Sequence, residues 1–136
     1  EEHDRVGSCG RPYTFVEAKI VDDQDREVPV GEPGEIVCRG LQLMSHYWDR
    51  PEDTARAMRG GWLHTGDIGQ LTPANWIRII DRKKNIFKLA QGEYVAPEKI
   101  ENVYVRCSLV EQVFVHGNSL KATLVAIVVP DAEEAA

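Results

Sequence analysis

The chain has 136 residues, and its 16 basic and 22 acidic side chains give a formal net charge of −6. Hydrophobic residues make up 43% and charged residues 28% of the chain, which is typical of a globular protein rather than a disordered one. The acidic balance argues against general nucleic-acid binding, because such binding needs a basic face that replaces the phosphate counterions. The longest nearly apolar run, residues 122–130, is too short for a membrane-spanning helix, which needs roughly 20 residues.

The three cysteines, Cys9, Cys38 and Cys107, are odd in number, far apart and without a CxxC pair. This pattern excludes a disulfide framework and argues against a structural zinc site. We therefore expect reduced thiols in a cytosolic compartment. The chain begins on Glu1 without a basic or apolar leader, so we expect no signal peptide and an excerpt of a longer protein.

Short strands are expected along much of the chain, because runs of β-branched and apolar residues are bounded by Gly, Pro and Asp. The expected extended ranges are 15–22, 35–39, 62–65, 76–80, 85–90, 110–116 and 122–129. After the third of these ranges, Gly66 and Gly69 indicate a loop.

Two helices are expected, each opened by a proline at its first position, where the missing N–H costs nothing. The first covers residues 51–58, with acidic residues at its positive end. The second covers residues 97–107, and one face is expected to pack on a sheet. That face carries Ile100, Val103, Tyr104 and Cys107. Many short strands followed by a strand–helix–strand–strand unit predict an α+β fold with a seam near residues 81–85.

Three polar positions are candidates for ligand contacts. Asp67, directly after Thr65-Gly66, offers two acceptor oxygens that suit two vicinal hydroxyls of a ribose. The alternative is a turn aspartate that bonds its own backbone. Arg82 could contact a ribose or phosphate through its fixed donors, and a solvated loop is the alternative. Gly92 would allow a sharp turn or a close approach to a ligand, and a plain β-turn is the alternative. The four histidines have no metal-ligand spacing, so no metal site is predicted.

Taken together and in order, several segments resemble the adenylate-forming superfamily of acyl-CoA synthetases, luciferase and peptide-synthetase adenylation domains. The segments are Gly34-Glu35-Ile36, Tyr47-Trp48, residues 50–54, residues 61–67, residues 81–84 and residues 92–101. The resemblance covers nearly the whole chain. Residues 79–131 look most like a long-chain fatty acyl-CoA synthetase, above all over residues 87–94 and 112–117.

Members of this superfamily activate a carboxylate with ATP to an acyl-adenylate, release pyrophosphate, and transfer the acyl group to the thiol of coenzyme A. The resemblance implies that Asp67 and Arg82 contact the ribose of ATP or AMP and that Ile79 lies near the nucleotide. Lys84 matches the hinge about which a small C-terminal domain rotates between the two half-reactions. Gln91-Gly92-Glu93 matches a loop on the coenzyme A side of the thioester-forming state.

The resemblance also implies a domain organisation. Residues 1–83 would be the C-terminal end of the large AMP-binding domain, with short strands in a barrel-like subdomain. Residues 84–136 would be the beginning of the small, mobile α+β domain. The family's phosphate loop, its Mg²⁺-engaging glutamate and its catalytic lysine fall outside these residues. No catalytic residue is therefore assigned, and the isolated chain is expected to be inactive.

The function implied is that of part of a long-chain fatty-acid–CoA ligase, with fatty acid, ATP and coenzyme A as substrates and Mg²⁺ as cofactor. The full-length enzyme is expected in the cytoplasm or peripherally on the cytosolic face of a membrane, without a nucleic-acid partner. One alternative is another acyl- or aryl-CoA ligase of the same superfamily. The other is a non-catalytic, truncated interaction module.

Overall fold

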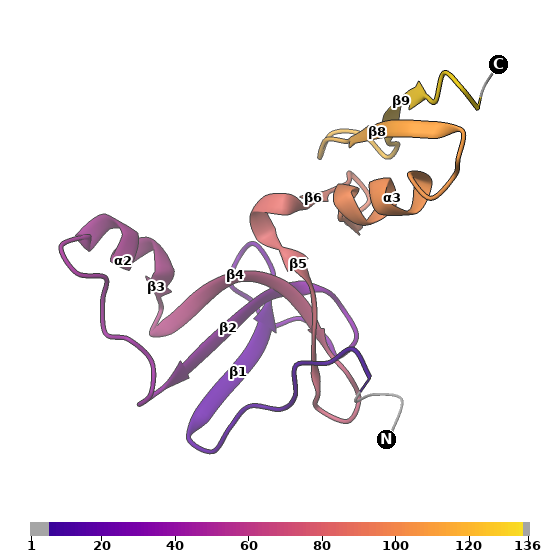
Figure 1. The fold of residues 1–136 in the computed structure, drawn as a ribbon. Helices are drawn as coiled ribbons and strands as arrows, with labels where there is room; N and C mark the ends of the chain where they lie inside the picture. The colour runs from indigo at the N-terminus through magenta and orange to yellow at the C-terminus, as the bar shows by residue number, and fades with distance from the viewer. Residues whose placement is uncertain (1–5, 135–136) are drawn as a thin grey trace. The chain divides into compact units, whose positions relative to one another are not determined.

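A computed structural model describes residues 6–134 of the chain (Figure 1). The chain divides into two compact units, Glu1–Lys83 and Lys84–Ala136. Each unit combines short strands with a helix, which confirms the predicted α+β class. Neither unit, over the described residues, has a helix long and apolar enough to cross a bilayer.

The first unit is built on a five-stranded antiparallel sheet. Its strands are β1 (Val16–Val21), β2 (Gly34–Gly40), β3 (Met58–Arg59), β4 (Trp62–Leu71) and β5 (Ile77–Arg82). The order is β1-β2-β4-β3, and β5 pairs with the C-terminal half of β4. As a result β4 contacts three other strands and forms the centre of the unit (Figure 1).

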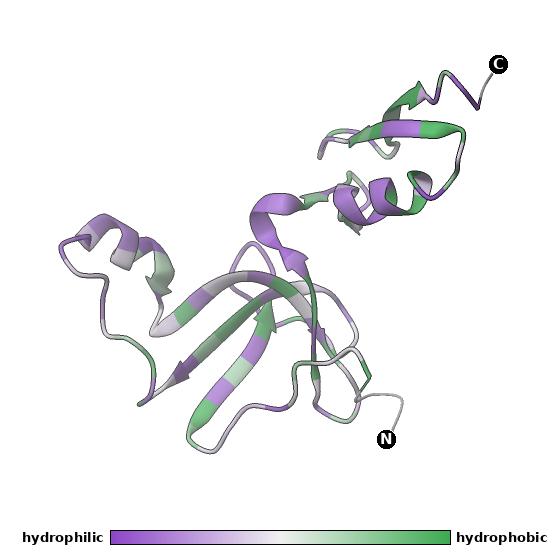
Figure 2. Cartoon of the chain, in the orientation of Figure 1, coloured by the Kyte–Doolittle hydropathy of each residue, from purple (hydrophilic) through white to green (hydrophobic). Residues whose placement is uncertain are grey.

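The core of this unit comes from buried aliphatic residues on three of its strands, β1, β2 and β5. Ile20, Ile36 and Ile77 form one buried cluster, and Leu71 packs against it. Each buried side chain of this size stabilises the fold by about 1.5–3 kcal/mol. Figure 2 shows hydrophobic stretches along the strands of this unit, whereas helix α2 (Pro51–Ala57) is mostly hydrophilic and buries no residue.

Helix α2 begins at Pro51, as the sequence predicts, and its first turn carries Glu52 and Asp53. The side chain of Thr54 stabilises this start, because its hydroxyl donates to the Arg50 carbonyl at 2.8 Å and accepts the Tyr47 N–H at 3.0 Å. Thr54 thus joins the loop at Tyr47 to the first turn of the helix.

The second unit holds two small hairpins and one helix. Strand β6 (Phe87–Lys88) pairs with β7 (Tyr94–Val95), and β8 (Val110–His116) pairs with β9 (Val125–Pro130). Helix α3 (Pro97–Tyr104) packs beside β8, where Glu101 accepts the Val115 N–H at 2.7 Å. A 3-10 turn, η1 (Lys83–Asn85), precedes β6.

Several expected elements differ in extent from those observed, two of them in the regions next to the domain boundary and in β4. The range 85–90 contains only the two-residue strand β6, because the chain first completes the turn η1. The expected loop at Gly66 and Gly69 is instead part of β4, which continues to Leu71. Glycine weakens a strand locally, but pairing with β2 and β5 on both sides holds this one.

The predicted burial of one helix face is wrong for most of its residues. Helix α3 ends at Tyr104, and Val103 and Tyr104 are 62% and 53% exposed, with Cys107 also exposed. Ile100 alone of the four is half-buried. Periodicity shows which side chains share a face, whereas the number of neighbouring elements decides how much of that face is covered.

Candidate functional site

The segment Thr65-Gly66-Asp67 bulges out of the central strand. In the β2–β4 ladder, Glu35 pairs with Ile68 and Val37 pairs with His64. The three residues of the segment therefore lie opposite the single residue Ile36. Gly66 has φ +72°, a left-handed conformation that glycine adopts without strain.

The side chain of Thr65 replaces ladder bonds that the bulge interrupts. Its hydroxyl donates to the Ile36 carbonyl at 2.8 Å and accepts the Asp67 N–H at 3.1 Å. The local side-chain-to-backbone bond is therefore made by Thr65, and the carboxylate of Asp67 contacts another strand instead.

The partner of that carboxylate is Arg82. Asp67 and Arg82 are opposite each other in the β4–β5 ladder, and Arg82 Nε lies 3.0 Å from Asp67 Oδ1. Both side chains remain partly accessible, at 24% for Asp67 and 60% for Arg82. Ile79 pairs with Gly69 further along β5 and is 47% exposed. The three predicted nucleotide-contacting residues thus lie on neighbouring strands, and their contact with a nucleotide stays a prediction.

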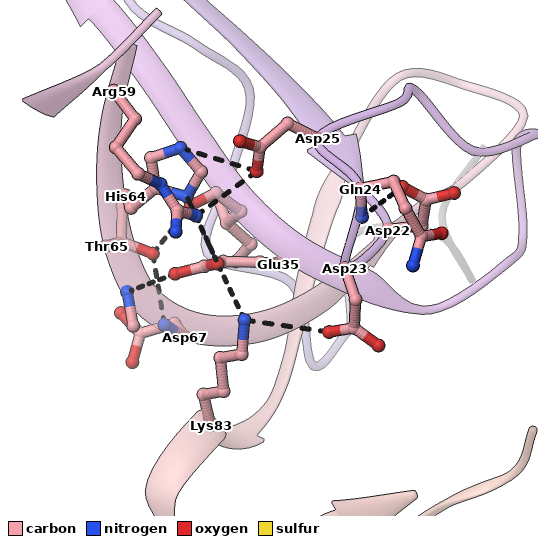
Figure 3. A network of polar contacts seen from close by, with 12 residues as sticks. Asp22, Asp23, Gln24, Asp25, Glu35, Arg59, His64, Thr65, Asp67 and Lys83 are labelled. Atoms are coloured by element: carbon pink, nitrogen blue, oxygen red, sulfur yellow. Dashed lines mark hydrogen bonds and ion pairs between the residues drawn. The ribbon is translucent and has the colours of Figure 1, made fainter. Parts of the chain in front are cut away.

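Next to this pair lies a buried carboxylate. Glu35 is 6% exposed, and both of its oxygens are engaged (Figure 3). Oε1 accepts the Gly66 N–H at 3.2 Å, and Oε2 accepts Lys83 Nζ at 3.0 Å. His64 Nδ1 lies 3.1 Å and Arg59 Nη2 lies 3.9 Å from Oε2. One acidic side chain therefore contacts the bulge, the residue that follows β5 and two further polar groups.

The electrostatic balance at Glu35 favours the ionised form. Burial alone would raise the pKa of Glu35, but hydrogen bonds and charges from His64 and Lys83 outweigh it and hold that pKa below its ordinary value. His64 Nδ1 also lies 2.8 Å from Arg59 Nη2. When Nδ1 carries a proton it donates to Glu35, and when it lacks one it accepts from Arg59.

A cleft of about 610 Å³ opens beside this network. It is lined by Glu35, His64 and Lys83 and by the arginines Arg50, Arg56 and Arg59. Asp67 and Arg82 are not among its lining residues, although Thr65 and Gly66 are. The described residues hold no cluster of three or more His, Cys, Asp or Glu side chains that could bind a metal ion.

The predicted loop in the second unit is a tight turn. The Gly92 N–H donates to the Leu89 carbonyl at 2.8 Å, and the Leu89 N–H donates to the Glu93 carbonyl at 2.8 Å. Gly92 has φ +95°, so a side chain there would be strained even where space allows one. Gln91 Nε2 donates to the Glu93 carboxylate at 3.2 Å. Lys84, the expected hinge, is exposed within η1.

Sequence reasoning missed three residues of the polar network. His64 reads as a structural or surface histidine, and Lys83 reads as part of a solvated charge run. Glu35 appears only as part of a short segment motif, yet one signal was present. Alternation places Glu35 on the same strand face as Val37, which is 1% exposed, so the pattern puts an acidic residue on a buried face.

Comparison with known proteins fits this geometry. The model of the family "AMP-binding enzyme" matches residues 1–48. Long-chain-fatty-acid–CoA ligase 1 of Cavia porcellus is 54% identical over 126 residues, which are 92% of this chain and 18% of that protein. The peroxisomal long chain acyl-CoA synthetase 7 of Arabidopsis thaliana is 50% identical over 135 residues, or 93% of this chain and 19% of that protein.

Solved structures of adenylate-forming enzymes are also similar to this chain. O-succinylbenzoate coenzyme A synthetase from Bacillus subtilis, in complex with AMP, is 28% identical with a TM-score of 0.69, over 94% of this chain and 26% of that one. The amide bond synthetase McbA from Marinactinospora thermotolerans is 31% identical with a TM-score of 0.66, over 92% and 26% of the two chains.

The chain is therefore homologous to part of the adenylate-forming enzymes. Among these enzymes it matches a segment of the long-chain-fatty-acid–CoA ligases, with identical residues at about half of the aligned positions. The chain spans only about a fifth of the length of these curated relatives.

Proposed function

We propose that these residues act within a long-chain fatty-acid–CoA ligase as its nucleotide-contacting and hinge segment. Such an enzyme converts a fatty acid, ATP and coenzyme A to acyl-CoA, AMP and pyrophosphate through an acyl-adenylate. The observation that carries the proposal is the Asp67–Arg82 pair, placed by the bulge of β4 and the register of β5. Sequence identity above 50% to a long-chain ligase supports the choice of branch.

The chemistry of the pair suits a ribose. Asp67 Oδ1 is held by Arg82, and the carboxylate can accept hydrogen bonds from two neighbouring hydroxyls. Arg82 contributes further donors in a fixed plane, and Ile79 offers an accessible apolar surface nearby on β5. In this proposal the ligands of Mg²⁺ and the catalytic lysine come from other parts of the enzyme.

In this proposal the second unit acts in the step that transfers the acyl group to coenzyme A. Lys84 is the hinge, and the tight turn at Gln91-Gly92-Glu93 brings backbone rather than side chain toward the pantetheine arm. We place the activity in the cytoplasm or on the cytosolic face of a membrane, by analogy with the superfamily.

The test compares substitutions of two carboxylates, Asp67 and Glu17, each of which pairs with an arginine on a neighbouring strand. Asp67→Asn in the complete ligase should lower kcat/KM for ATP about 10- to 100-fold, since a charged hydrogen bond contributes roughly 1.5–3 kcal/mol. Glu17→Gln is the matched control, because Glu17 also pairs across strands with an exposed arginine, Arg39, at 2.8 Å. The control should leave ATP use unchanged.

The measurement is ATP–pyrophosphate exchange with palmitate and with short aromatic acids as substrates. The proposal is supported if the wild-type protein shows exchange with palmitate, Asp67→Asn reduces that exchange, and Glu17→Gln leaves it unchanged. Exchange with an aromatic acid alone would instead indicate an aryl-CoA ligase. A complete protein that exchanges with neither acid would be a non-catalytic interaction module.

A further inference from the structure

The residue immediately before the expected hinge is tied to the interior of the first unit. The two compact units meet between Lys83 and Lys84, so Lys83 is the last residue of the first unit. The side chain of Lys83 is 43% exposed, yet its Nζ lies 3.0 Å from the buried Glu35 carboxylate. Asp23 Oδ1 lies 3.7 Å from the same ammonium group.

The same carboxylate holds the nucleotide-contacting bulge. Glu35 Oε1 accepts the N–H of Gly66, the residue next to Asp67, while Oε2 accepts Lys83 (Figure 3). Residues separated by 48 positions in the chain, Glu35 and Lys83, are thereby joined. One rigid side chain thus relates the position of the bulge to the position of the last residue before the boundary.

A second ion pair lies beside the Glu35–Lys83 pair but restrains the backbone less. The Asp67–Arg82 pair is accessible to solvent on both sides, and exposed ion pairs contribute little to holding a backbone in place. The Glu35 carboxylate is buried, so loss of Lys83 removes its nearest cation at a place where water cannot replace it, and leaves His64 and the more distant Arg59 beside Oε2. The Lys83 contact is therefore the stronger restraint on the backbone that follows β5.

We propose that Glu35 and Lys83 are positioning residues for the domain rotation between the two half-reactions. Their ion pair fixes Lys83, the residue that follows β5, so that backbone rotation starts at Lys84 rather than spreading back into the strand. A hinge works through a few residues that absorb the dihedral change, and it needs a stationary end. This inference rests on the proposed ligase function and on Lys84 as the hinge.

The test uses the complete ligase and measures both half-reactions separately. Lys83→Met keeps the length of the side chain and removes its charge. We expect ATP–pyrophosphate exchange within about twofold of wild type and thioester formation from preformed acyl-adenylate slowed about tenfold. Lys83→Arg, which retains a cation, should restore most of the thioester rate. Lys19→Met is the matched control and should change neither rate, because Lys19 lies over the Trp62 ring and not at Glu35.

A double variant tests whether Lys83 acts through Glu35. Glu35→Gln should slow thioester formation about as much as Lys83→Met does, and the variant with both changes should be no slower in that step than either single change. Additive losses in the double variant, equal losses in both half-reactions, or wild-type rates in Lys83→Met would each overturn the inference.

A structural readout separates this inference from the proposed function. Amide hydrogen exchange over residues 80–83 should be faster in Lys83→Met than in Lys19→Met and wild type, whether or not the protein makes acyl-adenylate. An inactive wild-type protein would contradict the ligase proposal alone. Unchanged hydrogen exchange at these amides would contradict only the positioning role of Glu35 and Lys83.

Discussion

Glu35 shows how a single residue can be buried, charged and stabilising at once. Its carboxylate is removed from water, but a backbone N–H and the cations around it replace the lost hydration. Because the pKa of Glu35 in the folded protein lies below its ordinary value of 4.5, ionisation favours the folded state. The stabilising contribution is present above about pH 4.5 and is lost as the pH falls through the lowered pKa.

Glu35→Gln should therefore reduce the free energy of unfolding in a pH-dependent way. We expect a loss of about 1–3 kcal/mol at pH 7, because Lys83 and the Gly66 N–H keep only a neutral partner. About one unit below pH 4.5 the difference between variant and wild type should shrink. Urea unfolding of both proteins at the two pH values measures it. A difference that stays constant with pH would show that the carboxylate is not ionised in the folded state.

At the scale of elements, strand β4 depends on close approach to both of its long neighbours. A Cβ added at Gly69 would lie 2.7 Å from the Arg78 carbonyl oxygen on β5 and 2.7 Å from Ile36 Cδ1 on β2. The Ile36 side chain can move, but the Arg78 carbonyl belongs to the backbone. Gly69 is therefore required for packing, whereas Gly66 is required for its positive φ.

Gly69→Ala should destabilise the protein by about 1–3 kcal/mol, which is typical of overpacking in a well-packed region. Gly61→Ala offers a comparison, since its Cβ would meet no atom within 4 Å and only the φ of +81° opposes it. We expect the smaller loss there, about 1–2 kcal/mol. Thermal unfolding of the two variants provides the measurement, and a larger loss for Gly61→Ala would count against this packing argument.

At the scale of the whole molecule, the chain places the predicted nucleotide-contacting residues in one unit and the turn at Gly92 in the other. Neither unit contains the Ser/Thr/Gly-rich phosphate loop that the family uses. We expect the isolated chain to form no acyl-CoA, because adenylate formation without its phosphate loop, cation and lysine lacks most of its transition-state stabilisation. A thioester assay with palmitate, ATP, Mg²⁺ and coenzyme A checks this, and product above background would refute it.

Local patterns in the sequence were sufficient for the elements that depend on neighbouring residues. Alternation predicted β1, and the flanking Pro33-Gly34 and Gly40 predicted β2. The proline followed by acidic residues predicted α2 at its observed first residue. Short motifs in order were sufficient for the family, because each depends on residue types at a fixed spacing. The number of strands around β4, and hence the continuity of that strand through Gly66 and Gly69, was outside the reach of such patterns.

Contacts between distant residues required the folded chain. The pairing of Asp67 with Arg82 depends on the register of β4 against β5, which shifts between Ile68 and Gly69. The burial of Glu35 and its bond to Lys83 depend on three strands meeting at one place. Periodicity assigns a side chain to a face, but only packing between distant segments determines which face is covered and which charges meet there.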